Sequence, residues 1–131
     1  MPHTIKVGVR LEREFVTKLD HCIEFPGGGY TPMLSTPSLI LELELTARDA
    51  IRPFHTDLEA SVGTFIELEH LAASLPGSFI HCAARVIHIN RSVITFAIEA
   101  SYGQKRIAKG IHRRRIVSKE RFQQRLMENP S

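Results

Sequence analysis

One stretch constrains the fold more than any other: Leu34–Ile51, which reads LSTPSLILELELTARDAI. It opens with Ser35-Thr36-Pro37, where a hydroxyl can accept hydrogen bonds from free N–H groups of a helix start and a proline suits the first helical position. Apolar side chains then recur at the spacing of one helix face. They are Leu39, Ile40, Leu43, Ala47, Ala50 and Ile51. The pattern predicts a capped, amphipathic helix.

The centre of this stretch also alternates, because Leu41 to Leu45 reads LELEL as a strand would. The cap and the length favour the helix, since strands seldom exceed about eight residues. In a helix, Glu42 and Glu44 point about 200° apart. One of these two carboxylates therefore lies nearer the apolar stripe than a surface carboxylate needs to.

The composition is that of an ordinary globular protein. The chain has 131 residues, of which 43% are hydrophobic and 24% charged, and we expect one domain over residues 1–131. No apolar run approaches the roughly 18 residues that span a bilayer, and the N-terminus lacks the apolar segment of a signal peptide. Cys22 and Cys82 have neither disulfide-scaffold nor zinc spacing. These features predict a cytoplasmic protein without a membrane partner.

Alternating segments surround the predicted helix. Strands are expected at residues 5–17, 60–71, 79–89, 92–102 and 105–117, and a short helix at 119–127. Residues 18–33 include FPGGGYTP and predict a loop, and turns are expected at Asn90-Arg91 and Gly103-Gln104. Short connections between consecutive strands favour an antiparallel sheet, and the helix must bury its stripe against that sheet. We therefore expect an α+β domain in which a curved five-stranded sheet wraps one long helix.

The strand at 60–71 is predicted to be two-faced. One face carries Val62, Thr64, Ile66, Leu68 and His70, and the other carries Phe65, Glu67 and Glu69.

Glu44 is the first candidate for chemistry. A carboxylate near a buried stripe is able to act as a base or nucleophile. The alternative is an exposed residue that forms an ion pair with Arg48 one turn later.

His70 and Thr36 are the next candidates. His70 ends the inward-facing series, where a histidine is either a satisfied structural residue or a catalyst at the mouth of a cleft. Thr36 is explained as a helix cap, but free N–H groups at a helix start also suit an oxyanion. In a straight helix, Thr36 and Glu44 are separated by about 12 Å of rise. Gly63 interrupts a strand, which indicates a bulge, a close ligand approach or a requirement of twist.

The formal net charge of +3 has a late basic excess, including Arg113, Arg114 and Arg115. This suits a polyanion, either a nucleic acid or a phosphate-bearing cofactor, or a solvated strand face. No aromatic residues interleave with these arginines and no recognition motif is present, which argues against nucleic acid. The seven histidines show no metal-ligand spacing such as HExxH, so we expect no metal.

The segments STPSLILELE and SVGTFIELEHLAASLPG, with the strands that follow, resemble the fluoroacetyl-CoA thioesterase-like family of the hot-dog fold superfamily. The likeness covers residues 16 to 117, and its strongest signature is Thr36-Pro37 with Glu44 eight residues after the threonine, followed by SVGT and HLA. It implies a homodimer or higher oligomer with thioester sites at the interface, and a CoA thioester as substrate without a further cofactor.

By position, the resemblance makes Thr36, Glu44 and His70 catalytic and assigns the N–H of Gly63 to the thioester carbonyl. The family's fluorine-selecting phenylalanines precede the helix, where this chain has FPGGGYTPML, with Phe25 and Tyr30 as the only aromatic residues.

The resemblance therefore implies hydrolysis of a small acyl-CoA rather than fluoroacetyl specificity, with Tyr30 as a substrate contact. Arg113 and Arg114 are weaker candidates for the CoA phosphates. The alternative is a non-catalytic acyl-CoA-binding or regulatory module.

Overall fold

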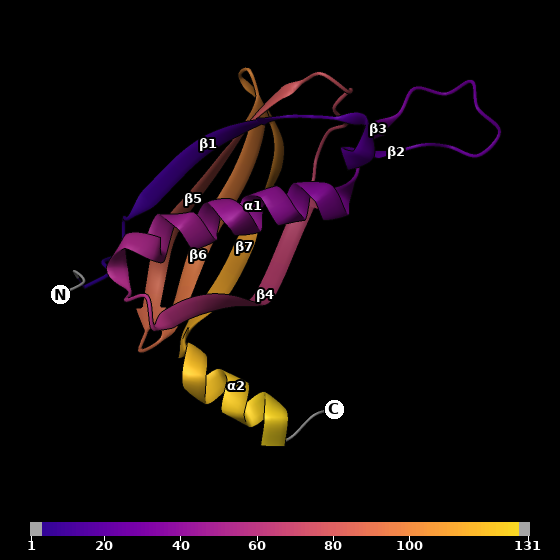
Figure 1. The fold of residues 1–131 in the computed structure, drawn as a ribbon. Helices are drawn as coiled ribbons and strands as arrows, with labels where there is room; N and C mark the ends of the chain where they lie inside the picture. Colours follow the sequence, from indigo (N-terminus) through magenta and orange to yellow (C-terminus); the bar gives the residue numbers. More distant parts are fainter. Residues whose placement is uncertain (1–3, 129–131) are drawn as a thin grey trace.

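The structure is a computed structural model, and it describes residues 4–128. The main sheet has five antiparallel strands in the order β1-β5-β6-β7-β4. Their bounds are β1 Arg10–Val16, β4 Glu59–His70, β5 Phe79–Asn90, β6 Val93–Tyr102 and β7 Lys105–Ser118. The long helix α1, Thr36–Ile51, lies across one face of this curved sheet (Figure 1). The α+β fold predicted from the sequence is confirmed.

The smaller elements occupy the two ends of the sheet. Strands β2 (Cys22–Ile23) and β3 (Met33–Leu34) pair with each other, and the glycine-rich loop between them projects away from the sheet (Figure 1). Helix α2, Lys119–Glu128, extends beyond the end of β7. Single-turn 3₁₀ helices cover Leu19–His21 and Arg52–Phe54. No helix within residues 4–128 is long and apolar enough to cross a membrane.

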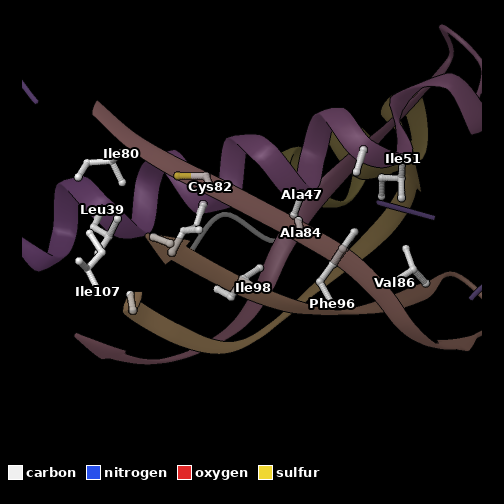
Figure 2. Close-up of a cluster of buried hydrophobic side chains, with 14 of the residues drawn as sticks. Leu39, Ala47, Ile51, Ile80, Cys82, Ala84, Val86, Phe96, Ile98 and Ile107 are labelled. Atoms are coloured by element: carbon white, nitrogen blue, oxygen red, sulfur yellow. The ribbon is translucent and has the colours of Figure 1, made fainter. Parts of the chain in front are cut away.

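The core lies between α1 and the concave face of the sheet. All the helix stripe residues are buried except Ile40, which is half-buried. Figure 2 shows Leu39, Ala47 and Ile51 of α1 facing side chains of β5, β6 and β7. The sheet contributes Ile80, Cys82, Ala84, Val86, Phe96, Ile98 and Ile107. Helical spacing on one side and alternation on the other thus meet in one apolar layer.

Several boundaries differ from the predictions by a residue or more, and two of them change where the chain turns. The first strand begins at Arg10 rather than residue 5, after a turn at Val7-Gly8. The hairpin between β5 and β6 turns at Arg91-Ser92, one residue later than predicted, because Asn90 still pairs with Val93. Arg91 takes the left-handed conformation, with φ of 56°, that such a turn requires. The predicted turn at Gly103-Gln104 is confirmed.

The predicted two-faced strand contains a β-bulge. The register of β4 against β7 shifts between Gly63 and Phe65. An extra residue reverses the alternation, so Gly63 faces α1 on one side of the bulge and Ile66, Leu68 and His70 face inward on the other. The prediction that Val62 and Thr64 share the inward face was wrong. Both line a groove on the outer face beside α2.

Candidate functional site

Helix α1 begins one residue earlier than a cap at Thr36 would require. Ser35 is the N-cap, with extended backbone angles, and its Oγ accepts a hydrogen bond from the N–H of Ser38 at 3.2 Å. Thr36 is therefore the first helical residue. The expectation that Thr36 caps the helix was wrong, and the correction releases its hydroxyl for another partner.

That partner is His70, at the end of β4. Thr36 Oγ1 and His70 Nδ1 are 2.8 Å apart and share a hydrogen bond whose direction depends on the imidazole tautomer. The two residues are 34 positions apart in sequence, so the contact is made by the fold. The helix start and the strand end thus bring together two of the three predicted catalytic residues.

The other ring nitrogen of His70 is distinctive. Nε2 is buried and has no hydrogen-bond partner among the residues that the structure describes. Most buried polar atoms in native structures have a hydrogen-bond partner. A buried atom without one therefore indicates a bound ligand, a water molecule or a functional role. Histidine is also the side chain best suited to proton transfer near neutral pH.

The two glutamates of the LELEL segment do separate. Glu42 Oε1 accepts a hydrogen bond from the Arg13 guanidinium on β1 at 2.6 Å, and its side chain is 13% exposed. Glu44 points towards β4, where its Oε1 lies 3.7 Å from the position that a Cβ on Gly63 would occupy. The alternative pair of Glu44 with Arg48 does not form; Arg48 binds Asp49 at 3.0 Å.

A buried polar cluster lies under Glu44. The Nδ1–H of His112 donates to the carbonyl of Phe65 at 2.8 Å, across the bulge. Its Nε2 accepts from Arg114 Nη1 at 3.2 Å. Arg114 also donates to the hydroxyl and the carbonyl of Ser61, both at 2.9 Å. These bonds tie β7 to both sides of the bulge that presents Gly63.

Burial and charge act together on this cluster. Burial lowers the pKa of His112, and the nearby Arg114 lowers it further, against the Phe65 carbonyl and Glu44, which raise it. Burial also lowers the pKa of Arg114, which Glu44 partly offsets. A neutral His112 fits the observed bonds, since Nε2 can accept only when it carries no proton.

The structure does not bring all predicted site residues together. Thr36 and Glu44 lie two turns apart on one regular helix, with about 12 Å of rise between them. Tyr30 lies in the projecting loop, 71% exposed, and its ring contacts Phe25 edge to face.

Arg113 and Arg114 point to opposite faces of β7. Arg113 covers the Phe65 ring, while Arg114 is 6% exposed and bonded as described. We therefore no longer expect Arg114 to bind CoA phosphates.

Sequence reasoning missed His112 and Ser61 as parts of the site. The histidines, His112 among them, were considered only as metal ligands, and their spacing argued against that role. A structural role in a buried cluster was not considered. The alternation of β7 gave a usable signal: His112 and Arg114 share parity with Ile116, which packs against the core. Two polar residues on an inward strand face indicate a buried polar cluster.

The fold belongs to the hot-dog class. One long helix packs against a curved five-stranded antiparallel sheet, and polar residues gather at the helix start and at the bulged edge strand. The family model for the fluoroacetyl-CoA-specific thioesterase FlK matches residues 16–120. The chain belongs to this family. No curated protein matches its sequence.

Solved structures agree with the fold. The fluoroacetyl-CoA thioesterase FlK is 22% identical, with a TM-score of 0.87 over 98% of this chain and 100% of that one. A thioesterase superfamily member from Thermus thermophilus is 27% identical, with a TM-score of 0.83 over 95% of each chain. A hot-dog-like protein from Thermanaerovibrio acidaminovorans is 17% identical, with a TM-score of 0.85 over 95% of this chain and 93% of that one.

Proposed function

We propose that the protein is an acyl-CoA thioesterase that hydrolyses a short or small acyl-CoA. The observation that carries this proposal is the bond between Thr36 and His70, which leaves a buried, unpaired His70 Nε2 beside the start of α1. Membership of the thioesterase family supports the reaction class. A variant of FlK has been solved in complex with acetyl-CoA, which supports a CoA thioester as the substrate class.

In the proposed reaction, Glu44 either takes a proton from water, which adds to the thioester carbonyl, or attacks that carbonyl itself. In the first route the C–O bond forms and the carbonyl becomes an oxyanion, which the N–H of Gly63 and the free N–H groups at the α1 start stabilise. The C–S bond then breaks. The CoA thiolate takes a proton from His70, held by Thr36, and the carboxylic acid leaves. The proton that Glu44 took from water then passes through solvent to His70, which restores both groups.

The second route runs through a mixed anhydride on Glu44, which water then hydrolyses. Both routes use the same three side chains. The separation of Thr36 and Glu44 along α1 is the geometric difficulty for either route, because one acyl group has to meet both ends.

A homodimer resolves this difficulty. Strand β4 is an edge of the sheet, and an exposed edge is a template for pairing with another chain. Antiparallel pairing of two β4 strands about a two-fold axis would set the His70 end of one strand beside the Gly63 end of the other. Glu44 of one chain would then face Thr36 and His70 of the partner. We propose that each site is shared in this way.

The test is a panel of acyl-CoA thioesters of increasing acyl size, including fluoroacetyl-CoA, with release of CoA followed by a thiol reagent. Wild type should turn over the small members, and Glu44→Ala should lose turnover by several orders of magnitude while retaining its fold. Near-normal turnover in Glu44→Ala would remove the proposed role of Glu44. Binding of CoA thioesters by wild type without any thiol release would instead establish a binding module.

The assay needs one control, because the chain has its own thiols. Cys82 is buried and its pKa is raised to about 12 by desolvation, whereas Cys22 is half-buried. A Cys22→Ser background removes the more accessible protein thiol without touching the site.

A further inference from the structure

A second concave site lies on the outer face of the sheet, away from the proposed catalytic residues. It is a groove of about 400 Å³ between α2 and the ends of β4 and β7. None of Thr36, Glu44 or His70 lines it. In Figure 1, α2 extends away from the end of β7. Residues of both elements line the groove.

The floor of this groove is apolar. It is formed by Val62 of β4, Val117 of β7, and Phe122 and Leu126 of α2. Phe122 and Leu126 are four residues apart and therefore share one face of α2. Both side chains line the groove with the sheet residues and are 37% and 48% exposed, whereas Met127, which does not line the groove, is 79% exposed. An apolar ligand in the groove would remove this surface from water.

The charged residues that line the groove are all positive. Arg115, Arg121 and Arg125 line the groove, and no aspartate or glutamate is among the lining residues. Within residues 4–128, none of the three guanidinium groups lies within 4.0 Å of a carboxylate. Arg121 and Arg125 are also one turn apart on α2, where like charges repel. A bound anion would relieve this repulsion.

We propose that this groove binds an aliphatic anion, that is, a carboxylate carrying a saturated hydrocarbon chain. The planar guanidinium groups match a carboxylate in charge and geometry. The chain would lie over the floor formed by Val62, Val117, Phe122 and Leu126. The volume falls in the range of small-molecule sites, which is about 300–1,000 Å³.

A basic amphipathic helix also suits an anionic membrane surface. The arrangement favours the small ligand, because Phe122 and Leu126 line an open groove together with Val62 and Val117 of the sheet. The experiment must therefore also be able to detect binding to a membrane.

The experiment is isothermal titration calorimetry of the full chain with decanoate, and with decanol as the uncharged probe of equal length. The variants are Arg121→Ala/Arg125→Ala and, as a matched control, Arg85→Ala, an exposed arginine of β5 outside the groove. Alanine favours the helix, and α2 contains no buried residue, so the double variant should fold. Circular dichroism checks this.

Wild type and Arg85→Ala should bind decanoate with equal affinity, and the double variant should bind it about tenfold or more weakly. Decanol should bind much more weakly than decanoate. Phe122→Ala, which removes part of the apolar lining, should also weaken the binding of decanoate.

Several results would overturn the proposal. They are equal binding of both probes, unchanged decanoate affinity in the double variant, and no decanoate binding by wild type together with its flotation on vesicles of phosphatidylglycerol and phosphatidylcholine. Binding is measured without turnover, so this test stands apart from that of the proposed hydrolysis.

Discussion

The buried side chains of Arg114 and His112 form a hydrogen bond of 3.2 Å in which Nη1 of the arginine donates to Nε2 of the histidine. The other ring nitrogen of His112 donates to the Phe65 carbonyl, so both ring nitrogens of the neutral imidazole have a hydrogen-bond partner. Protonation at Nε2 would break the bond to Arg114 and place two cations side by side in the interior. This pair makes the edge of the site sensitive to acid.

We expect the free energy of unfolding to fall in acid because of His112. Its pKa in the folded protein lies below the ordinary value of 6.5, so the unfolded chain binds the proton more readily. This contribution is complete above pH 6.5 and is lost as the pH falls from there through the folded-state pKa. Urea unfolding of wild type and His112→Gln across about pH 5 to 7.5 measures it. Equal pH dependence in the two proteins would contradict the assignment.

Glu42 and Glu44 provide a matched pair of substitutions two residues apart. Glu44→Gln keeps the size of the side chain but removes the base or nucleophile, so kcat should fall by about 100-fold or more. Glu42→Gln weakens the pair with Arg13 and should cost about 1 kcal/mol of stability with catalysis retained. Steady-state kinetics and urea unfolding of both variants separate the roles. A larger kinetic loss in Glu42→Gln would reverse the assignment.

The hydroxyl of Thr36 can be tested separately from Glu44. Thr36→Val keeps the shape but removes the partner of His70 Nδ1, so we expect kcat to fall by about tenfold or more. Thr36→Ser restores a hydroxyl and should retain most of the activity.

Ser35→Ala is the control for this substitution, because it removes the actual cap. It should cost about 1 kcal/mol of stability with catalysis intact. If Thr36→Val loses only stability, and does so to the same extent as Ser35→Ala, then Thr36 is structural.

The sequence was sufficient for the elements whose signals are local. The stripe from Leu39 to Ile51 and the strand alternations repeat over many residues, so an error at one position does not change the result. The position of the helix start was wrong by one residue because Ser35 and Thr36 are both suitable caps. Only the backbone geometry distinguishes them.

The bulge was one of three interpretations of Gly63 and is confirmed, but its exact position and the buried cluster could not be predicted in the same way. A bulge needs one extra residue in one strand, and the sequence of β4 alternates smoothly through Val62, Thr64 and Ile66. The partners of Arg114 and His112 lie on another strand, and Ser61 is 53 residues away from Arg114. Such long-range contacts depend on register, which no local pattern records. The role proposed for Gly63 was available beforehand in two ways, as a close ligand approach at a strand glycine and through the family resemblance.

The separation of Glu44 from Thr36 along α1 leads to the last prediction, which concerns the shared site. Glu44→Ala and His70→Ala should each be inactive as homodimers. If each site takes Glu44 from one chain and His70 from its partner, a mixed dimer has one site with both changes and one intact site. Random exchange of equal amounts should therefore restore roughly a quarter of wild-type activity. If all three residues of a site came from one chain, every site would keep one change and mixing would restore nothing. Activity before and after exchange by mild denaturation and refolding decides between the two arrangements, and light scattering that shows a monomer at micromolar concentration would contradict the dimer itself.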